Sequence, residues 1–465
     1  MSPLSRARLA ALTALPVLTA ALAVPLLTVP AGAAASDVHL NEVESNGDSA
    51  GDWVELLNTG TTAVDVSGWG VLDDDSSHTP ARVPSGTVLQ PGGYYVVTVE
   101  PGFGLGSTDQ ARLLTASGTV VDSTSWTAHA STTYGRCPNG AGAFTTTQAP
   151  TKGAANACPV AAQPWPGGSA VATADGTDVF GSDLSGLAYQ GTGVLWAAQN
   201  SGRLWRLVPN GGGGWKPDAG WTSGRTVRFP NGSGSPDAEA VALTGAGPSA
   251  GVFVGSERDG SSSTSRLSVL RYDVGGSATS LTATREWNLT VDLPAVSANG
   301  GIEALTFVPD AALTAAGFRT SAGATYDPAS YPAHFGGVFL VGVETGGAVH
   351  GYVLNEAGGF TRVASFGSGL AGVMDLEWEP ALATLWAVCD DTCAGRAATF
   401  EIVGGGFTAS AVYDRPSGMP AYNNEGFAVA PQGECVGDRK PVVWADDGND
   451  GGHALRTGTV SCSGR

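Results

Sequence analysis

Short apolar or alternating runs, broken by turn residues, recur along the whole chain after its first 35 positions. Trp53–Leu57 and Tyr94–Val99 are typical of the first part, where runs of five or six residues return every 10–15 positions. Leu195–Asn200 and Val338–Glu344 are typical of the second part, where apolar runs end in polar or acidic residues. Such runs between glycine, proline and asparagine turns predict β-strands. We therefore expect an all-β protein.

Two bodies and a linker are expected from the spacing of these runs. Residues 36–157 carry the strand spacing of a β-sandwich. Residues 158–168 are rich in proline, alanine and glycine and have no periodic pattern, which is typical of a linker. Residues 169–465 form the second body.

The first body contains motifs that resemble those of a lamin-tail domain, an immunoglobulin-like module also found on secreted bacterial proteins. The resemblance covers nearly the whole segment and implies an immunoglobulin-like sandwich that serves attachment or targeting and performs no chemistry. The motifs are Leu40–Val43, Asp52–Leu56, Asn58–Gly60, Val66–Trp69, Gly104–Gly106, Val120–Ser123, Thr133–Pro138 and Gly153–Asn156.

The second body contains a repeat. A short apolar strand entered through a small or acidic residue is followed by a strand that ends in polar or acidic residues. Alignment on Ser185, Glu239, Glu303, Glu377 and Glu425 gives intervals of 54, 64, 74 and 48 residues. A four-stranded propeller blade takes about 40–50 residues plus insertions. We predict a β-propeller with five visible blades, in which a sixth is possible, and a channel-mouth loop at residues 309–337.

The repeat resembles the propellers of the SdiA-regulated family and of related phytase-like secreted proteins. Asp183–Leu187 and Asn423–Ala428 carry the resemblance most clearly. It implies the propeller fold over about 290 residues and suggests, through the phytase-like name, hydrolysis of an ester or phosphate ester.

The amino-acid composition excludes several classes of protein for this chain. Only 14% of the residues are charged, 42% are hydrophobic, and 68 glycines, 27 prolines and 12 tryptophans are present. This mixture excludes a coiled coil, a helical bundle and a wholly disordered chain. The formal net charge of −19 argues against nucleic acid as a partner, because phosphate backbones require a basic face.

The first 35 residues have the form of a secretory leader. Two arginines precede the apolar run Leu9–Val29, and small residues follow up to Ala35, after which we expect cleavage. A retained membrane anchor is the alternative, but two prolines interrupt the run. Removing the leader removes two arginines and no acid, so the mature charge is −21. We expect an extracellular, monomeric protein with no membrane span in its mature chain.

Six cysteines remain in the exported chain. An even number in that compartment indicates disulfides, for which 15 connectivities exist. Zinc is disfavoured because the spacings do not match those of a zinc knuckle. Proximity in the sequence favours the pairs Cys137–Cys158, Cys389–Cys393 and Cys435–Cys462.

Recurring acids supply the candidate chemistry. Equivalent positions of the innermost strands converge on a propeller's axis, and uncompensated carboxylates that meet there need protons, a cation or amide donors. Calcium prefers six to eight oxygen ligands, so we predict Ca²⁺ on the axis. Alternatively, each acid accepts amide hydrogen bonds and locks neighbouring blades together. The candidate ligands are Glu239, Glu303, Glu377, Glu425 and Asp375, with a gap at Ser185.

A second set of acids at strand ends is expected to ring one channel mouth. The loop Asp446–Gly452 lacks the spacing of an EF-hand. The set consists of Glu257, Asp259, Glu344, Asp390, Asp391, Asp446 and Asp447.

The functional hypothesis is a lamin-tail module carrying a calcium-binding propeller that binds an unidentified ligand, or a component of the cell surface or matrix, at its channel mouth. A calcium-dependent esterase or phosphoesterase is the first alternative, and its catalytic residues are unknown. A non-catalytic adhesion protein is the second.

Overall fold

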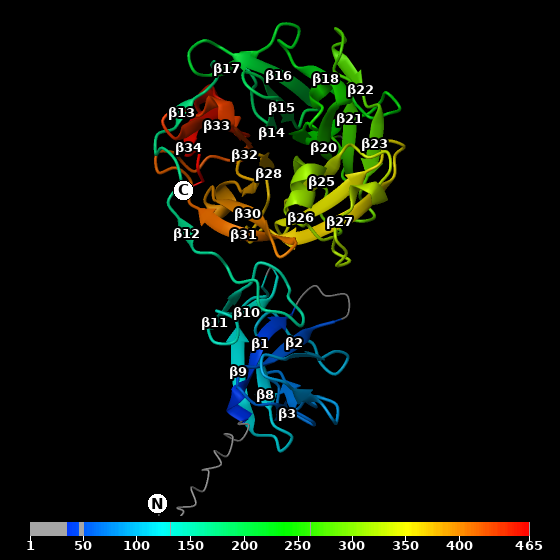
Figure 1. Cartoon of the computed structure of the whole chain (residues 1–465), viewed down its shortest axis with the longest axis vertical. Helices are drawn as coiled ribbons and strands as arrows, with labels where there is room; N and C mark the ends of the chain where they lie inside the picture. The colour runs from blue at the N-terminus through cyan, green and yellow to red at the C-terminus, as the bar shows by residue number, and fades with distance from the viewer. Residues whose placement is uncertain (1–34, 46–50, 131, 261, 465) are drawn as a thin grey trace, which may run out of the picture.

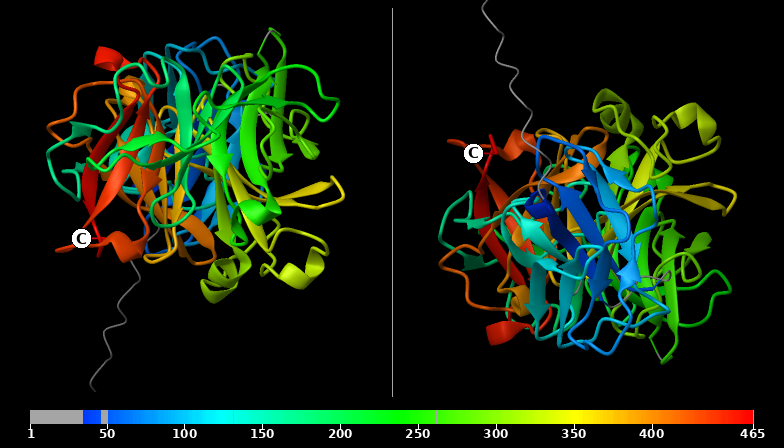
Figure 2. Two further views of the ribbon diagram at one scale, coloured as in Figure 1. Left: turned by 90° about the horizontal axis from the view of Figure 1, so that it is seen from above. Right: turned by 90° about the horizontal axis from the view of Figure 1, so that it is seen from below.

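The computed structural model describes residues 35–45, 51–130, 132–260 and 262–464 (Figure 1). Strands build two bodies within these ranges, and Figure 2, seen from below, places the blue and cyan strands of the smaller body in front of the larger one. The predicted leader lies outside the described residues except for Ala35, which begins the 3-10 turn η1 (Ala35–Asp37). No helix in the described ranges is long and apolar enough to cross a membrane.

The first body is a β-sandwich. One sheet has the order β11-β10-β1-β2-β7, the other has the order β5-β4-β8-β9, and β3 pairs with β6. Apolar side chains of both sheets meet in one core. The strands are β1 (Val38–Glu44), β2 (Trp53–Asn58), β3 (Val64–Asp65), β4 (Gly70–Leu72), β5 (Ala81–Arg82), β6 (Val88–Leu89), β7 (Tyr94–Thr98), β8 (Asp109–Leu114), β9 (Val120–Trp126), β10 (Tyr134–Cys137) and β11 (Ala143–Thr146).

Two buried glutamates tie the end of the sandwich to its first two strands. Glu42 on β1 accepts the backbone N–H of Thr151 at 3.1 Å, and Glu55 on β2 accepts the backbone N–H of Gly153 at 2.5 Å. Both side chains are fully buried. Acids of the lamin-tail motifs therefore serve the fold here, because buried carboxylates need such donors.

The second body consists of five blades within the described residues. Blade 1 contains β14 (Leu184–Tyr189), β15 (Leu195–Gln199), β16 (Arg203–Pro209), β17 (Trp215–Pro217), β18 (Arg225–Arg228) and β22 (Ser280–Thr282). Blade 2 contains β19 (Pro236–Ala242), β20 (Val252–Asp259), β21 (Ser265–Tyr272) and β23 (Arg285–Asn288), and blade 3 contains β24 (Ile302–Pro309), β25 (Gly337–Val343), β26 (Ala348–Leu354) and β27 (Phe360–Gly367). Blade 4 contains β28 (Asp375–Glu379), β29 (Thr384–Val388), β30 (Ala397–Val403), β31 (Gly406–Tyr413) and β12 (Ala162–Gln163), and blade 5 contains β32 (Asn424–Val429), β33 (Arg439–Asp446), β34 (Leu455–Ser461) and β13 (Ala172–Thr173).

The innermost strands form a closed ring. Each of β14, β19, β24, β28 and β32 contacts the next, and β32 contacts β14. Figure 1 shows the sheets arranged around a common centre. The all-β expectation and the propeller are therefore confirmed, with five blades in the described part of the chain.

The ring is closed by a strand from the beginning of the body. Strand β13 pairs antiparallel with β34, with Ala172 opposite Thr457, so blade 5 combines both ends of the propeller sequence. Strand β12 pairs parallel with β31 of blade 4. The side chain of Trp165 packs between Trp386 and Trp444. The segment expected to be a linker therefore lies against the propeller, because Ala162 and Gln163 extend the sheet of blade 4 and Trp165 packs against blades 4 and 5.

The long insertion of blade 3 connects its strands β24 and β25. It contains α1 (Asp310–Ala315) and the 3-10 turn η3 (Pro328–Ser330). Leu313, Phe318 and Tyr326 are buried in a core shared by blades 3 and 4. These apolar residues hold the insertion, which was expected at a channel mouth, against blades 3 and 4.

Three disulfides are present, and they join the pairs favoured by sequence proximity. They are Cys137–Cys158, Cys389–Cys393 and Cys435–Cys462. The second of these encloses the short turn η4 (Asp391–Cys393).

Candidate functional site

A polar cavity of about 290 Å³ lies at the end of the channel where the inner strands begin. Seven of its lining residues are acidic, Met374 is its one apolar residue, and none of the described residues lining it is Lys, Arg or His. The lining consists of Asp183, Asn200, Glu239, Asn299, Glu303, Glu344, Met374, Asp390, Asn423, Glu425 and Asp447.

Bulges in the inner strands direct three glutamates into this cavity. The pairing register shifts between Ala238 and Ala240 and again between Ile302 and Ala304, so Glu239 and Glu303 are the extra, unpaired residues. Glu425 occupies the same position on β32, where the register shifts around it. A bulge turns its extra side chain away from the regular alternation of the strand. The glutamates therefore point to the axis because of the bulges.

Blade 4 breaks this pattern. Strand β28 pairs with β29 without a shift from Asp375 to Glu379. Ala304 pairs with Gly342 and Asp375 pairs with Val388 where the regular ladder of each blade begins, so the residue equivalent to Glu303 is Met374, which lines the same cavity, and not Glu377. The repeat alignment was therefore wrong by three residues in this blade, and the acidic ring has two gaps, at Ser185 and Met374.

The two other predicted ligands lie elsewhere. Asp375 is fully buried, and its carboxylate accepts the backbone N–H groups of Leu187 at 3.1 Å and Phe427 at 2.8 Å. It thus joins blades 1, 4 and 5, as the blade-locking alternative predicts. Glu377 lines a different cavity of about 460 Å³ at the opposite end of the channel, with Tyr189, Phe307 and Trp378.

The carboxylates in the acidic cavity approach each other closely. One oxygen each of Glu239, Glu303 and Glu425 lies within 4.8 Å of the other two. The same holds for Glu257, Glu303 and Glu344. Such proximity without a compensating charge is unfavourable, so protons or cations must accompany the acids.

Several oxygens in this cluster are buried and lack a hydrogen-bond partner within the described structure. Buried polar atoms are nearly always paired, so these oxygens require a proton, a water or a cation as a partner. These atoms are one carboxylate oxygen each of Glu239, Glu257, Glu344 and Glu425, the Ser185 hydroxyl and the Asn200 amide oxygen.

Burial is the main cause that raises the pKa values of these acids. It raises the pKa of Glu239 and of Glu303 well above the ordinary value, and neighbouring carboxylates raise both further. Burial, and next the charge of Asp447, raise the pKa of Glu425 to about 8. Without a cation the cluster therefore retains protons near neutral pH.

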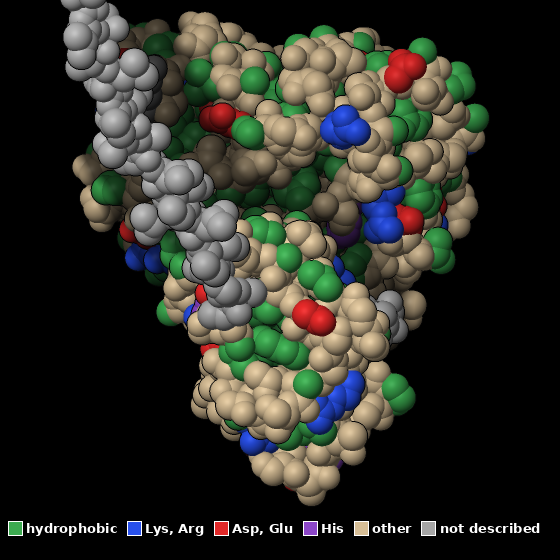
Figure 3. Space-filling model, turned by 60° about the horizontal axis from the view of Figure 1, so that its bottom comes forward, with side chains coloured by type: hydrophobic (Ala, Val, Ile, Leu, Met, Phe, Trp, Pro, Cys, Tyr) green, Lys and Arg blue, Asp and Glu red, His purple; other side chains and the backbone are tan. Residues whose placement is uncertain are grey.

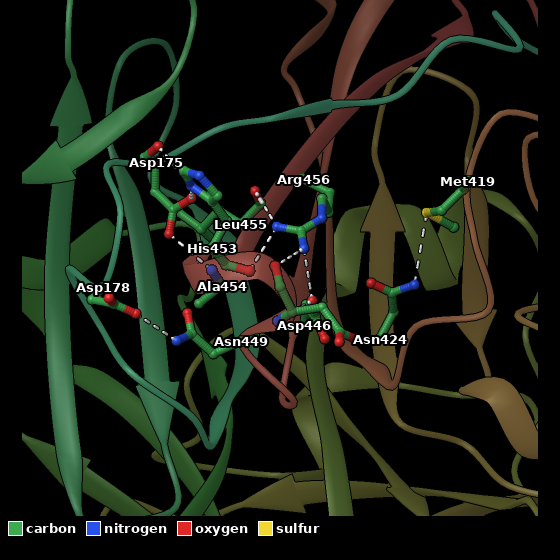
Figure 4. Close-up of polar contacts among 11 residues, drawn as sticks. Asp175, Asp178, Met419, Asn424, Asp446, Asn449, His453, Ala454, Leu455 and Arg456 are labelled. Carbon is green, nitrogen blue, oxygen red and sulfur yellow. Dashed lines mark hydrogen bonds and ion pairs between the residues drawn. The ribbon is translucent and has the colours of Figure 1, made fainter.

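Five of the seven strand-end acids have a clear place in the structure. Glu344, Asp390 and Asp447 line the cavity, and Glu257 belongs to its cluster, each at the end of the second strand of a blade. Asp446 instead forms a buried ion pair with Arg456 at 2.9 Å (Figure 4). The Asp446–Gly452 loop is consequently an internally bonded turn.

The arginines near the acidic strand ends each have a bonding partner of their own. Arg258 pairs with Asp237 at 2.6 Å, and Arg396 pairs with Asp414 at 3.2 Å. Arg415 donates to the carbonyl of Met419 at 2.9 Å. On the face drawn in Figure 3, acidic side chains are scattered and form no dense patch.

Two further features were missed at the sequence level. Gly247–Gly251 matches Gly-x-Ser-x-Gly, but it forms the 3-10 turn η2 (Gly247–Ala250), and the exposed Ser249 donates to the carbonyl of Ala246. A nucleophile elbow requires a strand-to-helix turn, so this match is not one.

In the sandwich, Asp73, Asp74 and Asp109 bring three oxygens within 4.8 Å of one another.

Comparison with known families identifies both bodies. The family model of the lamin tail domain matches residues 31–128, and the phytase-like model, described as esterase-like activity of phytase, matches residues 180–367. The lamin-tail and phytase-like resemblances are therefore confirmed. The second match spans blades 1 to 3, so Glu239 and Glu303 lie inside it and Glu425 lies outside. No curated protein matches the chain.

Solved structures show only distant similarity. A mitotic checkpoint complex matches with 12% identity over 91% of this chain and 89% of its own, at a TM-score of 0.28. An oxidoreductase of Thermus thermophilus, titled a glucose dehydrogenase, matches with 13% identity over 63% and 99%, at 0.35. The WD40 propeller domain of Doa1 matches with 14% identity over 63% and 72%, at 0.27. With scores this low, the propeller assignment rests on the chain's own strand pairing.

Proposed function

We propose that the protein is an extracellular, calcium-binding propeller whose lamin-tail sandwich attaches or targets it, and that it binds an oxygen-rich ligand at the acidic mouth. The observation that carries this proposal is the axial cavity, in which seven acids converge with no basic residue among the described residues lining it. The three disulfides and the expected leader support an oxidising, extracellular compartment.

Calcium suits this donor set. It binds carboxylate and amide oxygens with flexible geometry, and extracellular sites commonly use it. Glu239, Glu303 and Glu425 would hold the ion from three blades, and Asn200, Asn299 and Asn423 add amide groups to the same cavity. A ligand at the mouth would complete the coordination with its own oxygens.

Calcium should raise the thermal stability of the protein. An ion at 100 times its dissociation constant contributes about 2.7 kcal/mol of unfolding free energy, because it binds only the folded state. We expect the melting temperature, followed by circular dichroism, to rise by several degrees between EDTA and millimolar CaCl₂. Equal melting temperatures in the two buffers would refute calcium binding. The Glu425→Gln variant should show a smaller rise.

A calcium-dependent esterase or phosphoesterase is the second candidate, favoured by the description of the matching family model. A bound cation would polarise a carbonyl or phosphoryl oxygen and lower the pKa of a bound water. We expect, in this case, calcium-dependent hydrolysis of p-nitrophenyl acetate or p-nitrophenyl phosphate by the full chain. Glu303→Gln should abolish the turnover, whereas Glu401→Gln, at an exposed position on β30, should not. Turnover that persists in EDTA would exclude this mechanism.

A further inference from the structure

We propose that the acidic cavity binds two divalent cations bridged by the carboxylate of Glu303. This inference rests on the proposed cation binding and adds its stoichiometry and its bridging ligand. Two groups of three carboxylates meet in the cavity, and Glu303 is the residue common to both.

The first position lies between blades 2, 3 and 5. Glu239, Glu303 and Glu425 come from the inner strands β19, β24 and β32. Glu239 and Glu425 each have one buried oxygen without a hydrogen-bond partner. Glu239 is only 2% exposed, so bulk solvent does not solvate this oxygen, and a cation or an ordered water in the cavity has to supply the missing partner.

The second position lies between blades 2 and 3, on the second strands. Glu257 is on β20, and Glu344 follows β25 directly. One oxygen of Glu257 accepts the backbone N–H of Gly301 at 2.6 Å, and its other oxygen is buried without a partner. Glu344 also has a buried oxygen without a partner. The amide bond fixes the Glu257 carboxylate and leaves its second oxygen available to a cation.

A third group of acids already contains a positively charged partner. Asp237, Glu239 and Glu257 also meet, but Asp237 pairs with Arg258 at 2.6 Å. A guanidinium therefore supplies the positive charge at that corner, which leaves the two positions that share Glu303.

The charge balance favours two ions over one. Besides Asp183, Asp390 and Asp447, which line the same cavity, the glutamates of the two groups carry five negative charges when ionised. Two divalent cations compensate four of these, whereas a single ion leaves three uncompensated in a buried site, which is costly. The cavity of about 290 Å³ also has room for two ions and several waters, each of which takes about 30 Å³.

Manganese is a suitable probe, because two Mn²⁺ ions that share a carboxylate give an exchange-coupled electron paramagnetic resonance spectrum. We expect the full-length protein, freed of metal with EDTA, to show this coupled spectrum when it is titrated with MnCl₂. The Asp74→Asn background removes a carboxylate from the sandwich group, so that manganese bound there is not counted. Circular dichroism checks that each variant is folded.

Each variant has a distinct expectation. Glu344→Gln and Glu425→Gln should each retain one ion and lose the coupling, and Glu303→Gln should weaken both positions. Glu401→Gln should keep the coupled spectrum of the parent. Binding of a single uncoupled ion in the cavity by the parent would overturn the two-ion site and leave the proposed cation binding intact. No binding of Mn²⁺ or Ca²⁺ that depends on these glutamates would overturn both.

Discussion

Replacing Arg456 with methionine lowers the free energy of unfolding of the propeller by about 3–5 kcal/mol, the cost of leaving a buried charge without its partner. The guanidinium is 3% exposed, and it bonds to the Asp446 carboxylate at 2.9 Å and to the carbonyls of His453 and Asp450 at 2.6 and 2.7 Å. Methionine fills the space and supplies none of these donors. Urea denaturation followed by tryptophan fluorescence measures the change.

An exposed ion pair provides the matched control. Arg396 and Asp414 are 47% and 56% exposed, so Arg396→Met should change the free energy of unfolding by about 1 kcal/mol or less. If the two variants lost equal stability, the buried network around Arg456 in Figure 4 would not hold blade 5 together.

In the calcium-free protein, the free energy of unfolding should fall as the pH rises from about 4.5 to about 8. Burial raises the pKa of Glu425 from 4.5 to about 8, so in this window the folded state holds a proton that the unfolded state has lost. Each such proton makes the free energy of unfolding fall by about 1.4 kcal/mol per pH unit. Glu239 and Glu303, whose pKa values are also raised, act in the same direction.

Calcium should cancel this dependence, because the bound ion keeps the same carboxylates ionised and paired. The measurement is the melting temperature at pH 5, 6.5 and 8 in EDTA and in CaCl₂. Glu425→Gln should make the profile in EDTA less steep, since glutamine does not titrate whereas Glu239 and Glu303 still do. A stabilisation by calcium that is equal at all three pH values would contradict the coupling between the cation and these protons.

The overall fold could be predicted because each blade repeats the same sequence pattern of two consecutive strands. The closing strand could not be predicted in this way. Ala172 and Thr173 are two residues in a stretch rich in glycine and alanine, and only the free edge of β34 makes them a strand. Pairing with a distant edge leaves no local hydrophobic pattern.

The candidate site could be predicted only in part, for a related reason. Glu239, Glu303 and Glu425 were found because each precedes a small residue at a bulge, which the repeat shows as Glu-Ala or Glu-Gly. In blade 4 a glutamate recurs at position 377 on a strand without a bulge, and its side chain lines the cavity at the opposite end of the channel. Register depends on pairing with the next strand, and residue type alone does not reveal it.

The docked segment between the two bodies has a mechanical consequence. Any pull on the sandwich, for example when it holds a surface, reaches the propeller through β12, Trp165 and β13. Tension therefore arrives at the seam where the ring is closed, and the outermost strand of blade 5 is only two residues long. Under load the propeller would open at this seam first, so the sandwich and the blade that carries Glu425 are mechanically connected.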